Sequence, residues 1–433
     1  MIRATAKGFR LHIGFFGRRN VGKSSLLNAI TRQTVSIVSD VPGTTTDPVE
    51  KPMELEPIGP VLFVDTAGVD DVGALGAQRI EKTRQAIART DIGVLVTEAG
   101  VWGEFEEKLL AELRSHKIPV LVAVNKADLR QPTPEQIARF ESEKLAWTLV
   151  AATSGEGVDA FRELLRQAAP DEAAEPPAIV RDLVPPGETA IFVMPIDKEA
   201  PKGRIKNLQV QAIRDLLDGE SSCIVVKEAG FGKALDNMKT PPSLVVTDAQ
   251  VFDQVARITP NNVPLTAFSI LLSRLKGDLV TQSEAALTIE ELRPSNRILI
   301  AETCTHHPIE EDIGRVKIPR WLESFVGGKL EFTHVKGRDF PEDLSPYKLV
   351  IHCGACMWNR QEMMSRIREC QRQNVPITNY GLVIAMTQGI LERALEPFPE
   401  ALAAFREARA RKMAWAAIER APMLAEAEVV RVN

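Results

Sequence analysis

The stretch Gly17-Arg-Arg-Asn-Val-Gly-Lys-Ser-Ser25 decides how the first part of this 433-residue chain folds. It follows the apolar run Leu11–Phe16, which has the length and composition of a buried strand, and it leads into Ser25–Thr31, which is typical of a helix. This is the pattern G-x-x-x-x-G-K-[ST] between a strand and a helix, the setting that a phosphate-binding loop requires. The sequence therefore predicts an α/β domain that binds a nucleotide at the end of its first strand.

The residue types of this loop fit phosphate chemistry. Gly17 and Gly22 let backbone N–H groups curl around phosphates, and the helix that starts beside Ser25 points its N-terminus at them. Lys23 would reach the β- and γ-phosphate oxygens, and the hydroxyl of Ser24 would bind Mg²⁺. We expect all five residues to contact the nucleotide or its metal.

Two further segments fit the Mg²⁺ side of such a site. The predicted strand Val61–Val64 ends in Asp65-Thr-Ala-Gly68, where Asp65 would hold Mg²⁺ through water and Gly68 would approach the γ-phosphate. Between the two strands, Pro42–Asp47 contains three threonines, one of which could close on Mg²⁺ when the γ-phosphate is present.

A third strand carries the pattern that selects the base. Val120–Val124 is followed by Asn125-Lys126-Ala-Asp128. A carboxylate at Asp128 can accept hydrogen bonds from N1–H and the 2-amino group of guanine, and adenine has no equivalent pair of donors. The loop 151–157 occupies the place of the last guanine contact and would act through its backbone N–H groups.

These ordered motifs resemble the small GTPase superfamily, and within it the bacterial branch of tRNA-modifying and ribosome-assembly GTPases. The resemblance implies hydrolysis of GTP to GDP and phosphate by Lys23, Asn20 and Thr45, with Thr45 as the switch threonine on Mg²⁺. Asn20 resembles the asparagine that binds K⁺ in cation-activated relatives, so we predict stimulation by K⁺. Val69 stands where many GTPases have a water-orienting glutamine, which predicts either slow intrinsic hydrolysis or help from elsewhere.

A second pattern of scarce residues lies far downstream. It consists of two half-sites, Cys304-Thr-His306 and His352-Cys353-Gly-Ala-Cys356. They hold three of the chain's five cysteines and two of its six histidines. The strand-like runs Ile298–Ala301 and Leu349–Ile351 lead into them, and parallel strands present their carboxyl ends at one edge of a sheet. We expect the two half-sites to form one metal site.

The metal stays open at this point. Thiolates with an imidazole suit either zinc or an iron–sulfur cluster, and the alternative is that these cysteines are small buried hydrophobes. Zinc ligands usually lie in compact modules of a few dozen residues, whereas residues 307–351 separate these half-sites. Cys223 and Cys370 stand apart from both half-sites, and we expect them to lie in the core.

Composition changes divide the chain into three α/β domains. The segment 168–178 is rich in Ala, Pro and acidic residues and reads as a linker. We predict domains at residues 1–170, 178–262 and 265–433. Alternating strands and helices favour parallel sheets, including one in the third domain.

The half-sites, placed downstream of a GTPase domain, resemble the FeFe-hydrogenase maturation GTPases, the HydF family. The resemblance extends over nearly the whole chain, through Gly203-Arg-Ile205, Lys276-Gly-Asp-Leu279, His307–Asp312, Phe340–Asp343 and Asn379-Tyr-Gly381. It implies a P-loop GTPase domain, a small α/β dimerisation domain and an α/β parallel-sheet domain that binds an iron–sulfur cluster.

The same resemblance implies a scaffold and carrier. Cys304, Cys353 and Cys356 would hold a 4Fe–4S cluster, and His306 and His352 are the candidates for a labile fourth position. The cargo would be a two-iron precursor with CO and cyanide ligands, delivered to the FeFe-hydrogenase apo-enzyme. The radical-SAM maturases would be partners, and the chain would form a homodimer.

Charge and composition bear on the alternatives. The formal net charge of −5 argues against nucleic acid as the main partner, and therefore against the alternative of an RNA- or ribosome-directed GTPase with a structural zinc site. Neither a long apolar run nor a signal-peptide pattern is present, so we expect no membrane partner. The odd number of cysteines predicts a reducing, cytoplasmic location.

Overall fold

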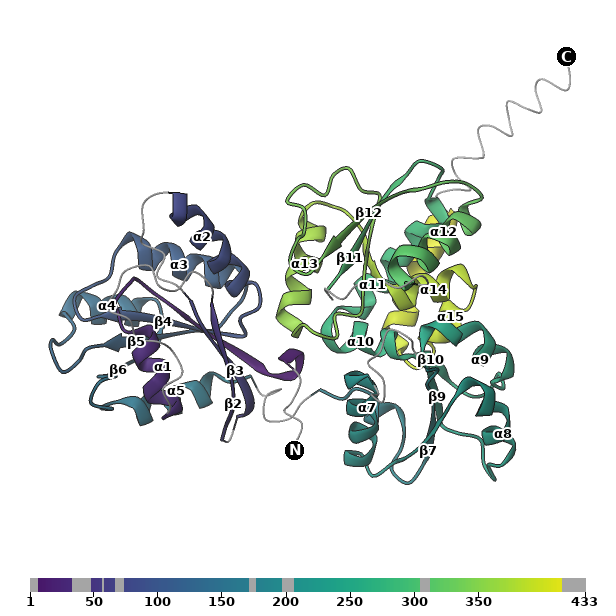
Figure 1. Cartoon of the computed structure of the whole chain (residues 1–433), viewed down its shortest axis with the longest axis horizontal. Coiled ribbons are helices and arrows are strands. Elements are labelled where there is room, and N and C mark those ends of the chain that lie inside the picture. Colours follow the sequence, from purple (N-terminus) through teal and green to yellow (C-terminus); the bar gives the residue numbers. More distant parts are fainter. Residues whose placement is uncertain are drawn as a thin grey trace, which may run out of the picture. The chain divides into compact units, whose positions relative to one another are not determined.

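The computed structural model describes residues 7–32, 48–56, 58–66, 74–170, 177–196, 206–303 and 312–414. It divides into two compact units, residues 1–177 with 357–365 and residues 178–356 with 366–433. Three sheets with helices packed on them make up these units, so the predicted α/β class is confirmed (Figure 1).

The first unit is built on a six-stranded sheet in the order β2-β3-β1-β4-β5-β6. Its strands are β1 (Leu11–Phe16), β2 (Val49–Leu55), β3 (Gly59–Asp65), β4 (Ile92–Glu98), β5 (Val120–Asn125) and β6 (Ala146–Leu149). All neighbouring strands are parallel except β2 and β3. The strands predicted at Leu11, Val61 and Val120 are confirmed, and their carboxyl ends carry the predicted motifs.

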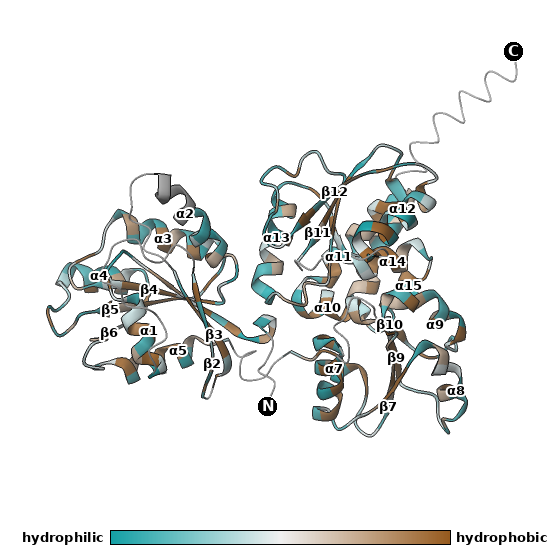
Figure 2. Ribbon diagram, viewed as in Figure 1, coloured by the Kyte–Doolittle hydropathy of each residue, from teal (hydrophilic) through white to brown (hydrophobic). Residues whose placement is uncertain are grey.

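Helices cover both faces of this sheet. They are α1 (Lys23–Thr31), α2 (Ala74–Ile87), α3 (Glu104–Ser115), α4 (Pro134–Ser142) and α5 (Val158–Ala168). Neighbouring residues of β1 serve opposite faces: Phe15 packs with α1 and α5, and Phe16 packs with α2, α3 and α4. Because both faces are buried, β1 is apolar nearly throughout, and the central strands appear brown in Figure 2.

The second unit contains two four-stranded parallel sheets. The first has the order β10-β9-β7-β8 and consists of β7 (Thr189–Val193), β8 (Ser222–Val226), β9 (Leu244–Thr247) and β10 (Leu265–Ala267). Its helices are α7 (Asn207–Asp218), α8 (Phe231–Asp236) and α9 (Phe252–Ile258). Since β10 pairs with β9, this sheet extends past residue 262, where we had expected the second domain to end.

The third sheet, in the order β12-β11-β13-β14, carries the cysteine half-site. Its strands are β11 (Arg297–Glu302), β12 (Glu331–Lys336), β13 (Leu349–His352) and β14 (Ile377–Asn379). All of them run parallel, as predicted. The carboxyl ends of β11 and β13 are therefore neighbours, with Ala301 opposite His352.

Helices surround this third sheet. They are α10 (Phe268–Lys276), α11 (Leu279–Ala286), α12 (Ile318–Val326), α13 (Arg360–Arg372), α14 (Tyr380–Thr387), α15 (Leu391–Leu395) and a helix at 399–414. Short helical turns lie at Lys7–Phe9, Arg181–Leu183, Glu228–Gly230, Ala249–Val251, Leu287–Glu291 and Ile313–Lys317. Residues 381–386 of α14 are all buried, so this helix forms part of the core of the second unit. Among the described residues, none of the helices is both long and apolar enough to cross a bilayer.

Candidate functional sites

The phosphate-binding loop connects β1 to α1 and relies on two glycines. Gly17 has a φ of +149°, and a Cβ there would lie 2.2 Å from the backbone oxygen of Val96. Gly22 has a φ of +92°, and a Cβ there would lie 2.1 Å from Nδ2 of Asn125. A side chain at either position would meet both backbone strain and a steric clash. The glycines of the motif are thus required by this fold.

The two metal-side groups of the loop face each other. Ser24 Oγ donates to Asp65 Oδ2 at 2.5 Å, so the hydroxyl and carboxylate expected on Mg²⁺ lie on one side of the loop. Lys23 is buried, with Nζ 3.0 Å from the carbonyl oxygen of Gly17 and 2.7 Å from that of Arg18. The ammonium thus lies inside the loop that would surround the phosphates.

The base-selecting motif joins the loop through Asn125. Its Nδ2 donates to the Val21 carbonyl at 2.9 Å, and its Oδ1 accepts from the N–H of Ala152 at 3.1 Å. Asn125 thereby ties the phosphate loop to the 151–157 loop. Lys126 pairs with Glu98, and Asp128 is exposed, where it can meet a base arriving from solvent.

Arg18 is a loop residue that our sequence reasoning missed. Its guanidinium donates to Glu106 at 2.6 and 2.8 Å, while the Glu106 carboxylate also accepts from the N–H of Gly103 at 3.0 Å. Glu106 is almost fully buried at the start of α3, so the pair fastens the loop to that helix. The partners are 88 positions apart, so no local sequence pattern predicts this contact.

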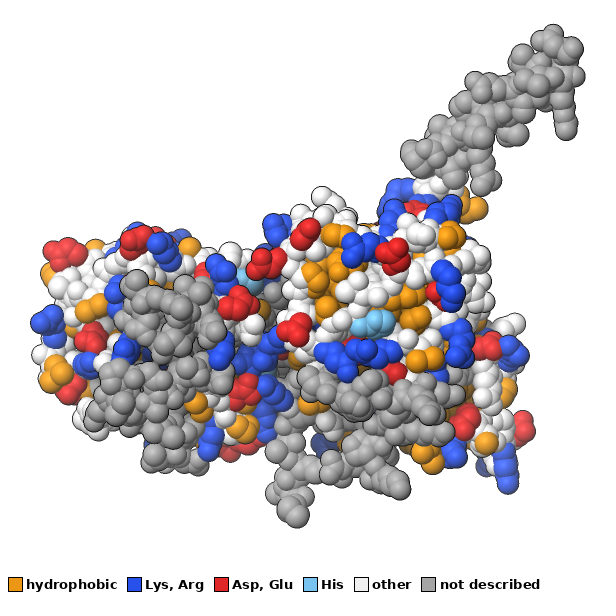
Figure 3. All heavy atoms as spheres, turned by 45° about the horizontal axis from the view of Figure 1, so that its top comes forward, with side chains coloured by type: hydrophobic (Ala, Val, Ile, Leu, Met, Phe, Trp, Pro, Cys, Tyr) orange, Lys and Arg blue, Asp and Glu red, His pale blue; other side chains and the backbone are white. Residues whose placement is uncertain are grey.

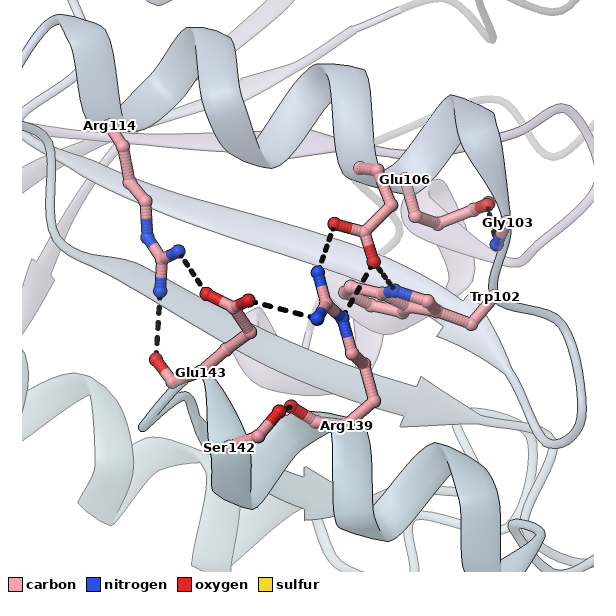
Figure 4. A network of polar contacts seen from close by, with 8 residues as sticks. Trp102, Gly103, Glu106, Arg114, Arg139, Ser142 and Glu143 are labelled. Carbon is pink, nitrogen blue, oxygen red and sulfur yellow. Dashed lines mark hydrogen bonds and ion pairs between the residues drawn. The ribbon is translucent and has the colours of Figure 1, made fainter.

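Helix α3 is in turn fastened to α4. Arg139 bonds Glu107 at 2.8 Å through two nitrogens and lies 3.0 Å from Glu143, which also accepts from Arg114 at 2.6 Å. Figure 4 shows Arg114 and Arg139 meeting Glu143 between the two helices. The hydrogen bonds from Arg139 lower the pKa of Glu107. This network stabilises the support of the phosphate loop.

The cysteine half-site forms the loop after β13. Cys353 N donates to the Ala301 carbonyl at 2.9 Å, and Cys353 Sγ lies 3.2 Å from the N–H and 3.4 Å from the hydroxyl of Thr303. Thr303 immediately precedes Cys304 in the sequence. The end of β11, which leads to the first half-site, therefore contacts the sulfur of the second.

The surroundings of Cys353 are buried and polar. Tyr380 donates to Glu302 Oε1 at 3.1 Å. Burial, with the nearby Cys353 and Glu302, raises the pKa of Tyr380 well above its ordinary value, so the hydroxyl stays protonated. Tyr380 and Glu302 thus form a hydrogen-bonded pair near Cys353, at the carboxyl edge of the sheet.

His352 is fully buried, and both of its ring nitrogens have protein partners. Nδ1 lies 2.7 Å from the Cys353 carbonyl and Nε2 lies 2.9 Å from Arg366 Nη1. Burial, followed by the charge of Arg366, lowers the pKa of His352 to about 3, so the ring is neutral. Arg366 also donates to the Gly337 carbonyl at 2.8 Å and stacks on Phe340. His352 could bind iron only by releasing one of these partners.

Several predicted site residues fall outside the described part of the chain: Thr45, Gly68, Cys304 and His306. Within the described ranges, three or more potential metal ligands do not gather in one place. Cys353 and Cys356 are the described thiols of the half-sites, and both are partly exposed.

Of the two remaining cysteines, Cys370 lies in the core as predicted, whereas Cys223 is only partly buried. Burial raises the pKa of Cys223 and of Cys370 to about 12, so neither thiol ionises readily. Cys370 is fully buried and Cys223 is half-buried in β8. That neither of them ligates metal stays a prediction.

Family models match most of the chain. The model of the 50S ribosome-binding GTPase matches residues 12–126, that of the Hydrogen maturase F dimerization domain matches residues 179–277, and that of the Hydrogen maturase F tetramerization domain matches residues 280–397. The last two models together cover the second unit from β7 to α15.

Whole-protein relatives match only in part. GTPase Der of Wolinella succinogenes is 34% identical over 163 residues, which are 35% of this chain and 34% of that protein. A tRNA modification GTPase MnmE of Prochlorococcus marinus is 37% identical over 156 residues, 35% of this chain and 33% of that protein. The chain thus spans about a third of the length of these curated relatives.

Among solved structures, Era of Aquifex aeolicus bound to GDP and AlF4⁻ is 21% identical. The match covers 50% of this chain and 93% of the Era chain, with a TM-score of 0.34. The G domain of the Thermotoga maritima FeoB iron transporter is 24% identical and covers 37% of this chain and 99% of that one, with a TM-score of 0.29.

Proposed function

Because this chain belongs to the hydrogenase maturase F family, we propose that it is a GTP-hydrolysing scaffold and carrier in the assembly of the FeFe-hydrogenase active site. Its first domain is a GTPase domain of the Der and MnmE type. The three-domain division at 1–170, 178–262 and 265–433 is part of this proposal, with β10 added to the second domain.

The observation that carries the cluster proposal is the contact between Thr303 and Cys353 Sγ. It joins the ends of β11 and β13, the two strands that lead to the half-sites, and Cys356 lies in the same loop. The donor set of three thiolates and an imidazole fits a 4Fe–4S cluster with one exchangeable position. Cys304, Cys353 and Cys356 would hold the cluster, whose open iron would supply an attachment point for a two-iron precursor with CO and cyanide ligands.

The chain's own residues would prepare this site. The N–H of Thr303 donates to Cys353 Sγ and the Thr303 hydroxyl lies 3.4 Å from it, so two polar groups hold the sulfur in place. His306 and His352 remain the candidates for the fourth position. For His352, binding would exchange Arg366 or the Cys353 carbonyl for iron, and release would restore that hydrogen bond. Such an exchange suits a site that accepts and gives up cargo.

In the nucleotide site, we assign the β- and γ-phosphates to Lys23 and Mg²⁺ to Ser24, Asp65 and Thr45. Asp128 would select guanine, since its carboxylate is exposed beside the loop that Asn125 fastens. Asn20 is exposed in this loop, with a φ of +57°, and we assign it as the K⁺ ligand. GTP hydrolysis would act as a switch for scaffold or partner contacts.

The dimerization and tetramerization domains indicate a homo-oligomer. The strand β8 lies at the edge of its sheet, and Val225 on it is 45% exposed, so we assign the dimer surface to this edge. The proposed partners are the apo-hydrogenase and the radical-SAM maturases.

We do not favour an RNA-directed GTPase with structural zinc, because residues 179–397 match hydrogenase-maturation domains. Charges of both signs are also interspersed on the face shown in Figure 3.

Delivery is tested by activating apo-hydrogenase. The protein is purified from cells that also make the radical-SAM maturases, incubated with FeFe-hydrogenase apo-enzyme, and hydrogen evolution is measured. We expect activation by the wild type and none by Cys353→Ser. The control Cys223→Ser changes a cysteine outside the loop and should activate normally. Equal activation by Cys353→Ser and the wild type would overturn the proposal.

A further inference from the structure

Lys276, the last residue of α10, is buried against the cysteine loop. Its side chain belongs to a residue that is only 3% exposed. Its Nζ lies 3.2 Å from the carbonyl oxygen of Cys356 and 3.4 Å from that of Ala355. An ammonium group inside the protein therefore contacts two successive peptide groups of the loop that carries Cys353 and Cys356.

Helix α10 also supports the loop sterically. A Cβ on Gly354 would lie 2.8 Å from Cδ1 of Leu272, one turn before Lys276 on the same helix. Ala355 is 1% exposed and has a φ of +52°, a left-handed conformation that alanine seldom adopts. The loop thus packs closely against α10, and contacts with that helix stabilise the left-handed backbone conformation of Ala355.

The hydrogen bonds of Lys276 also orient the loop's N–H groups. In a trans peptide the C=O and N–H of one plane point in opposite directions. Holding the carbonyls of Ala355 and Cys356 toward Lys276 therefore turns the N–H groups of these two peptide planes to the other side. Left-handed turns that expose successive N–H groups form concavities that bind anions, including the sulfur atoms of iron–sulfur centres.

A neutral side chain could bond the same carbonyls. An amide would supply donors to Ala355 and Cys356 without bringing a charge into the interior, where an ion is costly to bury. Lysine adds a positive charge next to a loop with two thiols that ligate metal as thiolates. That charge would stabilise a negatively charged group bound by the loop, and more so after the group gains an electron.

We propose that Lys276 is a positioning residue of the iron–sulfur site, which shapes the Gly354–Cys356 loop and raises the reduction potential of the cluster bound there. The inference rests on the proposed function, because it presumes a cluster on Cys353 and Cys356. The potential of such clusters follows local charge and hydrogen bonding, and Lys276 provides both. Its positive charge favours the reduced form.

The test separates the hydrogen bonds from the charge. Lys276→Gln keeps N–H donors without the charge, Lys276→Arg keeps both, and Lys276→Met keeps neither. Lys348→Met removes the same charge at the amino end of β13, where Lys348 is half-exposed, and serves as the matched control. Each full-length protein is reconstituted anaerobically with iron and sulfide. Iron per chain, loss of iron to a chelator and the midpoint potential by EPR-monitored titration are then measured.

We expect Lys276→Arg and Lys348→Met to match the wild type. Lys276→Gln should bind iron but shift its reduction equilibrium about tenfold toward the oxidised form, which is about 59 mV more negative for one electron. Lys276→Met should show that shift and also lose iron to the chelator about tenfold faster. A wild-type potential in Lys276→Gln, with iron bound, would overturn the inference and leave the proposed function intact. A wild-type protein that binds no iron would overturn both.

Discussion

Two buried lysines show how differently the two candidate sites are built. Lys23 and Lys276 each direct their ammonium at two backbone carbonyls of a loop that follows a parallel strand. The carbonyl partners of Lys23 are five and six positions away, inside its own motif. Those of Lys276 are 79 and 80 positions away, in another part of the chain. The first site is local in sequence, and the second is assembled by the tertiary fold.

The difference bears on what each lysine can do. Lys23 lies in the space that phosphates would occupy, so nucleotide binding would exchange its carbonyl bonds for phosphate oxygens. Lys276 supports its loop from α10, so its bonds can persist while a ligand binds to the loop. We therefore regard Lys23 as a ligand-exchanging group and Lys276 as a fixed support.

The largest expected effect follows from Lys23. Lys23→Ala should lower kcat for GTP hydrolysis by about 100-fold or more, because a preorganised charge at the transferred phosphate is lost. Iron per chain should stay unchanged, because Lys23 belongs to the phosphate loop and the cysteine loop is supported by Lys276 instead. The control Lys108→Ala alters an exposed lysine of α3 and should hydrolyse GTP normally. Loss of iron in Lys23→Ala would show that the sites are not built independently.

The glycines of the two loops sharpen the comparison. A Cβ on Gly17 would meet a backbone oxygen at 2.2 Å, whereas a Cβ on Gly354 would meet the end of the Leu272 side chain at 2.8 Å. Leu272 can move and Val96 O cannot, so Gly17→Ala should destabilise its unit by about 2 kcal/mol and Gly354→Ala by less than about 1 kcal/mol.

Thermal unfolding of the full chain measures this difference. One kcal/mol corresponds to about 2–4 °C in Tm for units of this size. Equal decreases in the melting temperature for Gly17→Ala and Gly354→Ala would contradict the view that the phosphate loop is the more rigidly packed of the two.

Comparing K⁺ with Na⁺ tests whether the phosphate loop needs a bound K⁺ ion for fast GTP hydrolysis. If Asn20 binds K⁺, GTP hydrolysis should be about tenfold faster in KCl than in NaCl, a difference of about 1.4 kcal/mol in the barrier. Asn20→Ala should remove the difference and leave the NaCl rate nearly unchanged. Steady-state phosphate release in matched salts is the measurement, and equal wild-type rates in the two salts would refute the assignment.

A further effect concerns acid. Burial lowers the pKa of His12, near the amino end of β1, to about 4 from an ordinary 6.5. The unfolded chain binds the proton more tightly, so stability is present above pH 6.5. It is lost as the pH falls toward 4, by at most about 1.4 kcal/mol per pH unit.

His12→Asn should flatten this dependence in the first unit. Urea unfolding at pH 7 and pH 5 measures it, with the fluorescence of the chain's five tryptophans as the probe. An unchanged pH dependence in the variant would assign the acid sensitivity to another group.

Much of the fold could be predicted from local patterns. The strand β1 has the predicted bounds, because a continuous apolar run that ends at turn residues is a clear signal. The strand β2 escaped us, since its sequence VEKPMEL mixes charges with a proline. The three-residue strand β10 is too short for any periodicity, which explains why the expected domain boundary fell before it.

The candidate sites divide in the same way. The contacts of Lys23, Ser24 and Asp65 follow from motifs, because the chemistry requires those residue types at fixed spacing. The partners of the cysteine loop are set by the packing of distant helices and strands, and sequence spacing does not encode them. The hydrogen bond between Arg366 and His352 is an example. Because of it, His352 is already hydrogen-bonded, whereas the sequence had suggested an available ligand.

The most direct test of the cysteine site is metal analysis of anaerobically purified protein. Iron, sulfide and zinc are measured with the visible spectrum for the wild type, Cys353→Ser and the control Cys223→Ser. We expect a brown protein with about four irons per chain, lost in Cys353→Ser and retained in Cys223→Ser. A colourless protein with about one zinc and no iron after reconstitution would contradict it.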